Sequence, residues 1–355
     1  MTMTNTDNTD PLQNTNIDAV LPLPSPQMIR DEIPLSSVAR ETVAKGRREI
    51  IEIIERRDPR LLVVLGPCSI HDLSAGLEYA KRLQTLSRKL DAQLALVMRI
   101  YFEKPRTTVG WKGFINDPHL NDSFEVEVGI REARRFLIQI AELGIAAGTE
   151  ALDPIIPQYL GDLFSWYAIG ARTTESQTHR EMASGLSAPC GFKNATDGNI
   201  DIAINAIKSA NQPHHFLGIT EQGNTAVIRT RGNSHGHLIL RGGSRPNYDV
   251  ASIDDAVQRL AASDLPCSIM VDCSHGNSDK DPARQAVVAR ACVAQRSAGQ
   301  RALIGLMIES HLNWGNQPLS ANRDELKYGV SITDACIDWQ TTVDLLQELH
   351  EESPR

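Results

Sequence analysis

Four side chains of the kinds that bind transition metals lie at or soon after the ends of apolar segments in this 355-residue chain. They are Cys68, His275, Glu309 and Asp334. A thiolate, an imidazole and two carboxylates suit a divalent first-row transition metal, so Mn, Fe, Co or Zn is expected rather than Mg or Ca. The four residues do not have the close spacing of a zinc-binding motif. They could form one site only in a fold that brings the ends of these apolar segments together. A buried cysteine, a capping histidine and two solvated acids are the alternative interpretation.

Cationic side chains end other apolar segments and indicate an anionic ligand. They are Arg99, Arg172, Lys193 and Arg241. These charges would repel one another unless a negative group lay among them. Arginine binds phosphate and carboxylate through a planar two-pronged contact, and a phosphate carries about −1.5 to −2 charges near neutral pH. The sequence therefore predicts a small phosphorylated acid as ligand, with ion pairs to nearby glutamates as the alternative.

The long segment 101–124 adds a second group of cations. It contains Lys104, Arg106 and Thr107, and Pro105 restricts the backbone between the two cations. Loops of this length in compact domains are usually functional or disordered. We expect a second phosphate site at Arg106 and Thr107.

Eight short apolar segments alternate with helix patterns from residue 61 onward, and the residues above lie at their ends. The segments are 61–66, 94–100, 145–150, 166–172, 188–194, 237–243, 267–276 and 302–310. Helix patterns between them include 74–90, 124–143, 174–185 and 282–298. Such alternation is typical of a parallel sheet covered by helices, and eight units predict a closed (β/α)8 barrel of α/β class. The first, seventh and eighth strands would then be neighbours, and all strand ends would meet at one mouth. No G-x-G-x-x-G follows the first strand to favour an open doubly wound sheet.

Two parts of the chain stand outside this alternation. Residues 1–60 are expected to form a regulatory or oligomerisation arm and a helix, with the catalytic barrel over 61–355. The prolines of "LPLPSPQMIRDEIPL" (21–35) argue against a helix there, whereas 36–58 carries a helical apolar stripe. The segment of about 214–236 is expected to be an inserted β-hairpin.

Composition narrows the possible partners and location. The net charge of −8 argues against nucleic acid or an anionic membrane as the main partner. No apolar stretch reaches the length of a membrane span, and the polar N-terminal sequence has no signal-peptide pattern, so a cytoplasmic location is expected. The six cysteines show no paired spacing that would predict a disulfide framework.

The motifs around these residues resemble one enzyme family. They are "GPCSIHD", "MRIYFEKPRTTVGWKG", "GARTTESQTHREMASGLS", "GFKN", "LRGG", "VDCSHGN", "GLMIESHL" and "YGVSITDACIDW". The chain resembles the microbial class I 3-deoxy-D-arabino-heptulosonate 7-phosphate (DAHP) synthases over essentially its whole length. The resemblance implies a metal-dependent (β/α)8 transferase that condenses phosphoenolpyruvate with erythrose 4-phosphate in the first step of the shikimate pathway. Ala195 and Ser234 depart from the expected Gly and Pro, and neither is a proposed ligand.

Residue by residue, the resemblance implies the following roles. The metal ligands are Cys68, His275, Glu309 and Asp334. The phosphoenolpyruvate contacts are Arg99, Lys104, Arg172, Lys193 and Arg241. The erythrose 4-phosphate contacts are Arg106 and Thr107. Lys104, Cys68 and His275 are expected to take part in catalysis, with Lys104 as proton donor to the developing alkoxide.

Regulation and assembly are implied in the same way. Members of the family are typically inhibited by an aromatic amino acid in a separate pocket, here at Asp153, Pro154, Pro157, Leu186 and Ser187, near the N-terminal arm. The motifs "LDP" and "REMASGLS" are more similar to the tyrosine-sensitive branch, so tyrosine is the expected inhibitor. A homodimer or homotetramer is also implied.

Other functions remain open at this point. A sister enzyme would use arabinose 5-phosphate, although "KPRTT" favours the erythrose enzyme. A Schiff-base aldolase would use Lys193 and need no metal. A non-catalytic barrel would bind a metabolite without turnover.

Overall fold

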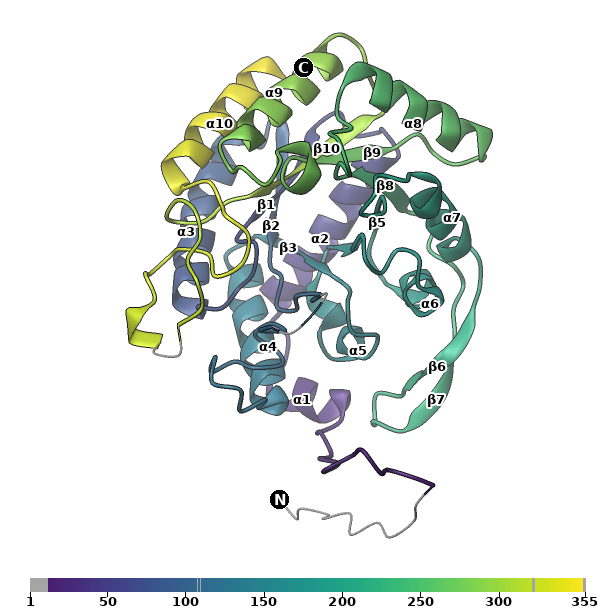
Figure 1. The fold of residues 1–355 in the computed structure, drawn as a ribbon, viewed down its shortest axis with the longest axis vertical. Coiled ribbons are helices and arrows are strands. Elements are labelled where there is room, and N and C mark those ends of the chain that lie inside the picture. The colour runs from purple at the N-terminus through teal and green to yellow at the C-terminus, as the bar shows by residue number, and fades with distance from the viewer. Residues whose placement is uncertain (1–11, 107, 109, 321–322, 354–355) are drawn as a thin grey trace.

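A closed barrel of eight parallel strands forms the centre of the computed structural model, which describes residues 12–106, 108, 110–320 and 323–353 (Figure 1). The barrel strands are β1 (Leu61–Gly66), β2 (Leu94–Arg99), β3 (Ala146–Glu150), β4 (Trp166–Ile169), β5 (Cys190–Lys193), β8 (Gly236–Leu240), β9 (Ile269–Asp272) and β10 (Leu303–Glu309). Each strand pairs in parallel with its neighbours along the chain, and β10 returns to β1, with Gly66 beside Glu309. The predicted (β/α)8 barrel is confirmed, and β1, β10 and β9 are neighbours as expected.

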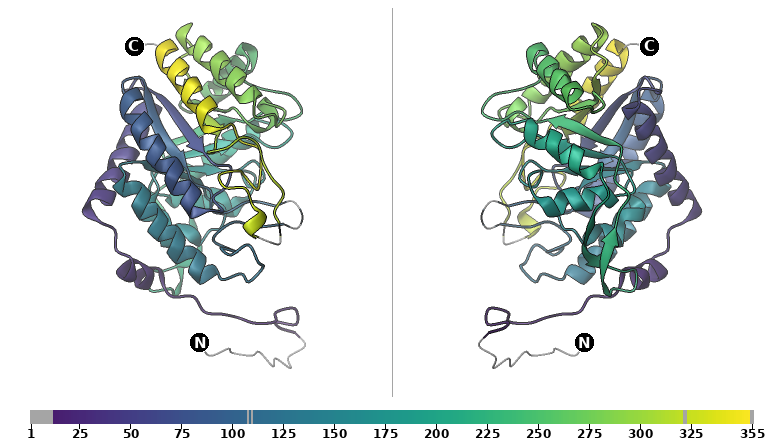
Figure 2. Two further views of the ribbon diagram at one scale, coloured as in Figure 1. Left: turned by 90° about the vertical axis from the view of Figure 1, so that its left-hand side faces the viewer. Right: turned by 90° about the vertical axis from the view of Figure 1, so that its right-hand side faces the viewer.

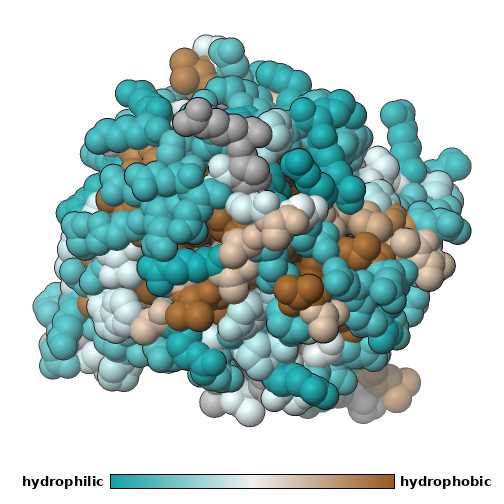
Figure 3. All heavy atoms as spheres, turned by 90° about the horizontal axis from the view of Figure 1, so that it is seen from above, coloured by the Kyte–Doolittle hydropathy of each residue, from teal (hydrophilic) through white to brown (hydrophobic). Residues whose placement is uncertain are grey.

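Helices surround the barrel as an outer layer (Figures 1 and 2). The α-helices after the first barrel strand are α3 (Leu73–Leu90), α4 (Val126–Glu142), α5 (Ile156–Leu160), α6 (Gln177–Gly185), α7 (Asp201–Ala210), α8 (Val250–Ala262), α9 (Arg284–Ser297) and α10 (Trp339–Glu352). Short 3-10 turns occur at η1 (Gly161–Leu163), η2 (His275–Asn277) and η3 (Arg323–Glu325). The helix patterns read from the sequence correspond to α3, α4, α6 and α9. Seen from above, hydrophilic residues cover most of the surface, and hydrophobic residues show only in patches between them (Figure 3).

Helix α2 (Ser37–Ile54) closes the amino-terminal end of the barrel. Its residues Ile50, Ile53 and Ile54 belong to the same apolar cluster as the inward-facing strand residues of the barrel. Gly46 lets the helix come close, because a Cβ there would lie 2.7 Å from Ser165 Oγ and 2.8 Å from the Ala146 Cβ. The outward-facing strand residues pack instead against the surrounding helices in a second cluster. The barrel is therefore sealed at this end, and its other end holds the polar residues.

The sequence interpretation was wrong about one part of the N-terminal arm. Prolines were expected to exclude a helix over 21–35, yet α1 spans Pro26–Glu32. Pro26 occupies the start of the helix, where the missing N–H costs no intrahelical bond, and Ser25 Oγ accepts a hydrogen bond from Met28 N at 3.3 Å. A proline excludes a helix only when a turn of the helix precedes it.

The predicted hairpin is present, as β6 (His215–Ile219) paired antiparallel with β7 (Thr225–Arg229). It lies outside the barrel, and its turn contacts α1, because Gln27 N donates to Glu221 O at 2.8 Å. Leu217 and Val227 lie opposite each other on the hairpin and are 77% and 63% exposed. None of the described helices combines the length and apolar character that crossing a bilayer requires.

The seal formed by α2 can be tested with Ile50→Ala. Ile50 is 1% exposed at the end of the barrel interior, so truncation removes buried methyl groups and leaves a cavity. We expect the free energy of unfolding to fall by about 2–5 kcal/mol, measured by urea denaturation. The control is Val38→Ala, because Val38 lies on the same helix and is 55% exposed. It should change the free energy of unfolding by less than about 0.5 kcal/mol. Equal effects of the two variants would contradict this role of α2.

Candidate active site

Charged side chains occupy the last inward-facing position of several barrel strands. Side chains alternate along a strand, so the residue two places after a buried inward-facing residue also faces the barrel axis. Val97, Met270 and Met307 belong to the interior cluster, which places Arg99, Asp272 and Glu309 in the layer above them. The barrel interior is thus apolar near α2 and charged at the carboxyl ends of the strands, where (β/α)8 enzymes have their active sites.

A cavity of about 320 Å³ opens at this charged end. The charged residues that line it are Arg99, Lys104, Arg106, Glu150, Arg172, Lys193, Arg241, His275, Lys280 and Asp334. Every substrate-binding residue predicted from the sequence lines this cavity except Thr107, which lies outside the described residues. Arg172 and Arg241 line the cavity and form no ion pair within 4 Å in the described part of the chain.

The predicted metal ligands lie together, and two of them, His275 and Asp334, line this cavity. Ligand atoms of Cys68, Glu309 and Asp334 all lie within 4.8 Å of one another, and His275 Nε2 lies 3.9 Å from Asp334 Oδ2. Glu309 Oε1 is buried without a hydrogen bond, although Arg99 Nη2 lies 3.0 Å away. A buried carboxylate that is ion-paired with Arg99 but accepts no hydrogen bond at Oε1, beside a thiol, a second carboxylate and an imidazole, fits a divalent transition metal.

Hydrogen bonds to the main chain hold Glu309 and Cys68 in place. The Gln285 side chain donates to Glu309 O at 3.0 Å and accepts from Glu309 N at 2.8 Å, as a neighbouring strand would. Lys104 Nζ lies 3.2 Å from both Cys68 Sγ and Cys68 O. Burial and the nearby Glu309 charge raise the pKa of the Cys68 thiol to about 11, so a bound cation would be needed to favour the thiolate.

Two of the predicted phosphoenolpyruvate contacts are in buried ion pairs. Arg99 is 1% exposed, lies 3.0 Å from Glu309 and stacks 3.7 Å above the Tyr101 ring. Lys193 is 4% exposed and donates to Asp272 at 2.8 Å. Although burial alone would raise the pKa of Asp272, the charges of Lys193 and His275 hold it well below its usual range. Arg99 and Lys193 are therefore in ion pairs, as the alternative interpretation of the sequence expected. Within the described residues, Arg172 and Arg241 are not.

Sequence reasoning assigned no role to three charged residues of this site. Glu150 and Asp272 lie in the predicted strand segments 145–150 and 267–276, and Lys280 lies outside the predicted segments. Glu150 Oε1 is buried with no hydrogen bond and lines the same cavity. The signal for Glu150 and Asp272 was the two-residue alternation of the strands, since both follow small or apolar inward-facing residues.

Comparisons with known proteins identify the family. The model of the DAHP synthetase I family matches residues 33–347. The Tyr-sensitive phospho-2-dehydro-3-deoxyheptonate aldolases of Salmonella typhimurium and Escherichia coli are each 55% identical over 343 residues, which is 97% of this chain and 96% of theirs. The chain belongs to the DAHP synthetase I family.

Other relatives support the same assignment. The Phe-sensitive aldolase of E. coli is 50% identical over 340 residues, or 96% of each chain. A solved phospho-2-dehydro-3-deoxyheptonate aldolase from Francisella tularensis superposes with a TM-score of 0.92 at 48% identity, covering 95% of this chain and 98% of that one. The recognition made from the motifs is thus confirmed, including the greater similarity to a Tyr-sensitive enzyme than to the Phe-sensitive one of E. coli.

The expected inhibitor-binding residues of this DAHP synthetase family member lie apart from the cavity, around α5 and α6. Asp153 is exposed, and its Oδ1 accepts from Ile155 N at 2.7 Å at the start of α5. Pro154 and Pro157 are half-buried beside it. Leu186 and Ser187 follow α6, and His179 of that helix contacts Leu152 O at 2.8 Å.

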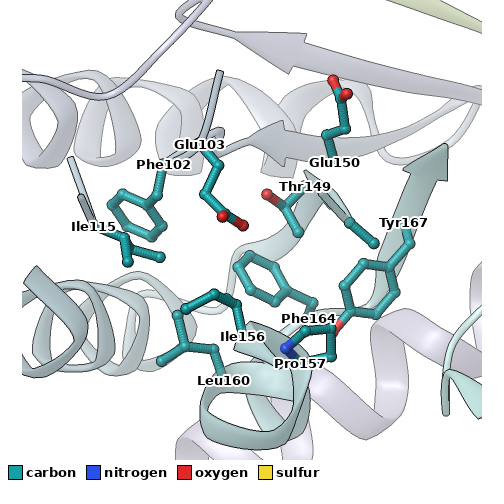
Figure 4. Close-up of a pocket in the computed structure, with 11 residues that line it drawn as sticks. Phe102, Glu103, Ile115, Thr149, Glu150, Ile156, Pro157, Leu160, Phe164 and Tyr167 are labelled. Atoms are coloured by element: carbon teal, nitrogen blue, oxygen red, sulfur yellow. The ribbon is translucent and has the colours of Figure 1, made fainter. Parts of the chain in front are cut away.

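A small apolar cavity lies between this region and the active-site loop (Figure 4). Phe102, Ile156, Leu160 and Phe164 line it, and the Glu103 carboxylate points into it from the residue before Lys104. Burial, together with the charge of Asp153, raises the pKa of Glu103 to about 8. Glu103 is therefore protonated in the folded protein at neutral pH.

Glu103→Gln should change how stability depends on pH. The pKa of Glu103 is higher in the folded protein than the value of about 4.3 for an unfolded glutamate. The contribution of protonated Glu103 to the stability of the folded protein is therefore complete below about pH 4.3 and is lost as the pH rises toward 8. We expect the difference in the free energy of unfolding, variant minus wild type, to be about 1–3 kcal/mol larger at pH 8 than at pH 5. Denaturant titration of both proteins at each pH measures it. The exposed Glu351→Gln is the control, and parallel curves for Glu103→Gln and wild type would contradict the prediction.

Proposed function

We propose that this chain catalyses the metal-dependent condensation of phosphoenolpyruvate with D-erythrose 4-phosphate, giving 3-deoxy-D-arabino-heptulosonate 7-phosphate and phosphate in the first step of the shikimate pathway. The observation that carries the proposal is one cavity lined by several cations and by His275 and Asp334, with the Cys68 thiol and the Glu309 carboxylate grouped beside Asp334. The names of relatives 50–55% identical over nearly the whole chain agree with it. A cytoplasmic location fits the absence of a spanning helix from the described residues.

The cations of the cavity would bind and orient both substrates. Arg172, Lys193 and Arg241 supply charge for the phosphate and carboxylate of phosphoenolpyruvate, and Arg99 lies below them at the cavity floor. Arg106, on the loop after β2, would bind the phosphate of erythrose 4-phosphate together with Thr107. Holding two reactants in register can lower a barrier by about 7–11 kcal/mol, so orientation is the largest contribution expected from these residues.

Lys104 is suited to move a proton during the reaction. A divalent Mn, Fe, Co or Zn ion held by Cys68, His275, Glu309 and Asp334 would supply Lewis-acid polarisation of the aldehyde. Burial alone would lower the pKa of Lys104, but Cys68, Glu309 and Asp334 nearby raise it overall, which favours the ammonium form. After C3 of phosphoenolpyruvate attacks the aldehyde carbon, this ammonium can protonate the developing alkoxide.

The second half of the reaction requires water at C2 and loss of phosphate. Glu150 has an unpaired buried carboxylate oxygen in the same cavity and is suited to hold that water. Schiff-base chemistry at Lys193 is disfavoured, because Lys193 Nζ donates to Asp272 at 2.8 Å in a buried ion pair. An arabinose 5-phosphate enzyme would share most of these groups, so the aldehyde must be tested directly.

The first test is phosphate release from phosphoenolpyruvate with erythrose 4-phosphate or arabinose 5-phosphate. We expect turnover with erythrose 4-phosphate, loss of activity in EDTA, and recovery on adding Mn²⁺, because the aldehyde needs a Lewis acid. Cys68→Ala should bind less metal by elemental analysis and lose activity by at least about 100-fold. Lys104→Ala is the companion variant, which should retain metal and lose turnover. EDTA-resistant activity or borohydride trapping would instead support Schiff-base chemistry, and no turnover would support a binding protein.

Inhibition by an aromatic amino acid, with tyrosine favoured, is the proposed regulation. The supporting observations are the segment 152–157 beside α6 and the contact of Tyr159 Oη with Pro24 O at 2.9 Å, which ties α5 to the arm. We expect tyrosine to inhibit at concentrations at which phenylalanine does not. Ser187→Phe, at an exposed position, should abolish inhibition while leaving uninhibited turnover within about twofold. Inhibition by phenylalanine alone would contradict the choice of tyrosine.

Assembly into a homodimer or homotetramer is the proposed oligomeric state. Apolar residues of the arm are exposed, including Ile17 (46%), Leu21 (66%) and Leu23 (43%), and so are Leu217 and Val227 of the hairpin. Exposed apolar groups of this extent favour burial in an interface. Light scattering should give a dimer or tetramer mass for the wild type and a smaller mass for a chain lacking residues 1–23. A monomeric wild type would contradict this proposal.

A further inference from the structure

One buried carboxylate connects the proposed metal ligands with the proposed phosphoenolpyruvate contacts. Asp272 ends β9, and its side chain is fully buried. Its Oδ2 lies 2.8 Å from Lys193 Nζ and 3.0 Å from His275 Nδ1. The same oxygen therefore contacts a cation of the anion-binding side and the imidazole of the metal-binding side.

The local chain conformation holds the carboxylate in this position. The second oxygen, Oδ1, accepts from Ser274 N at 3.0 Å and from Ser274 Oγ at 2.8 Å. Asn277 Nδ2 donates to Asp272 O at 2.9 Å and to Leu240 O at 3.1 Å, which secures the turn after β9. His275 has a φ of 56° in this turn, so the chain folds back and places its ring beside Asp272.

This arrangement decides which nitrogen of His275 is available. His275 Nδ1 lies 2.7 Å from Ser274 Oγ, which donates to Asp272 Oδ1 at 2.8 Å, and it lies 3.0 Å from Asp272 Oδ2. A hydrogen on Nδ1 directed at Asp272 and Ser274 leaves the lone pair on Nε2, which is the nitrogen that lies 3.9 Å from Asp334. Metal-binding histidines usually donate their second nitrogen to a carboxylate in this way. The ring is therefore oriented toward the other proposed metal ligands before a metal binds.

Lys193 depends on the same carboxylate. The side chain is 4% exposed, and Asp272 is its only ion-pair partner within 4 Å in the described part of the chain. A buried ammonium without a counter-charge is strongly disfavoured, so loss of the carboxylate would displace or neutralise Lys193.

We propose that Asp272 is a positioning residue for both halves of the site: it orients His275 toward the metal and holds Lys193 Nζ in place for phosphoenolpyruvate. This rests on the proposed function, because it takes His275 as a metal ligand and Lys193 as an anion contact. Removing the charge of Asp272 should therefore weaken two binding events that involve different residues.

The test measures each binding event separately by calorimetry on the purified full chain. Mn²⁺ is titrated into the metal-free protein, and phosphoenolpyruvate is titrated in the absence of metal, so that one loss cannot cause the other. Asp272→Asn should weaken Mn²⁺ binding by about 10–100-fold, the range for second partners of metal-binding histidines, and phosphoenolpyruvate binding by at least about 10-fold. Lys193→Met should weaken only phosphoenolpyruvate binding. Asp255→Asn removes the charge of an exposed carboxylate on α8, which pairs with Arg259, and should leave both affinities within about threefold.

The visible spectrum of the Co²⁺-loaded protein adds a readout of coordination geometry, and it should change in Asp272→Asn and not in Lys193→Met. A folded Asp272→Asn with both affinities unchanged, or with only one of them weakened, would overturn the proposal. If Asp272→Asn does not fold, Asp272→Glu keeps the charge and displaces it by one methylene; unchanged affinities in that variant would also overturn it. A wild type that binds neither Mn²⁺ nor phosphoenolpyruvate would refute the proposed function itself, and this proposal with it.

Discussion

Pairing of β1 with β10 is the constraint on which the rest of this molecule depends. It closes the barrel, sets Gly66 beside Glu309, and thereby brings the residue after the first strand next to the end of the last one. Cys68 and Glu309 are more than 200 positions apart in the chain, yet their ligand atoms lie within 4.8 Å together with Asp334. Without closure, β1 and β10 would be opposite edges of an open sheet, and Cys68 and Glu309 would lie far apart.

Closure also creates a gradient of polarity along the barrel axis. The end covered by α2 is filled with aliphatic side chains, whereas the layer at the carboxyl ends of the strands is charged. Burying charges is costly unless each has a partner, and the pairs Arg99–Glu309 and Lys193–Asp272 meet that requirement in the deepest positions. Arg172 and Arg241, nearer the opening, have no such pair and are available to a ligand.

The arm and the hairpin lie on the outside of this barrel and contact each other through α1. They approach α5, and the segment that begins α5 lies close to Glu103, the residue before Lys104. The proposed inhibitor site and the proposed catalytic lysine are therefore connected through a small, buried region. Packed interiors transmit displacements because they contain little free volume, which gives regulation a physical route.

The sequence alone determined the barrel, because eight apolar segments alternating with helix patterns allow few other architectures, and it determined the family, because its motifs are long and specific. It also singled out Cys68 and Arg172 as candidate site residues by residue type and position. Only the tertiary structure decided that Arg99 and Lys193 are buried in ion pairs and that Asp272 contacts both Lys193 and His275. Pairing and burial depend on distances between residues far apart in the chain, and neither residue type nor spacing along the sequence contains those distances.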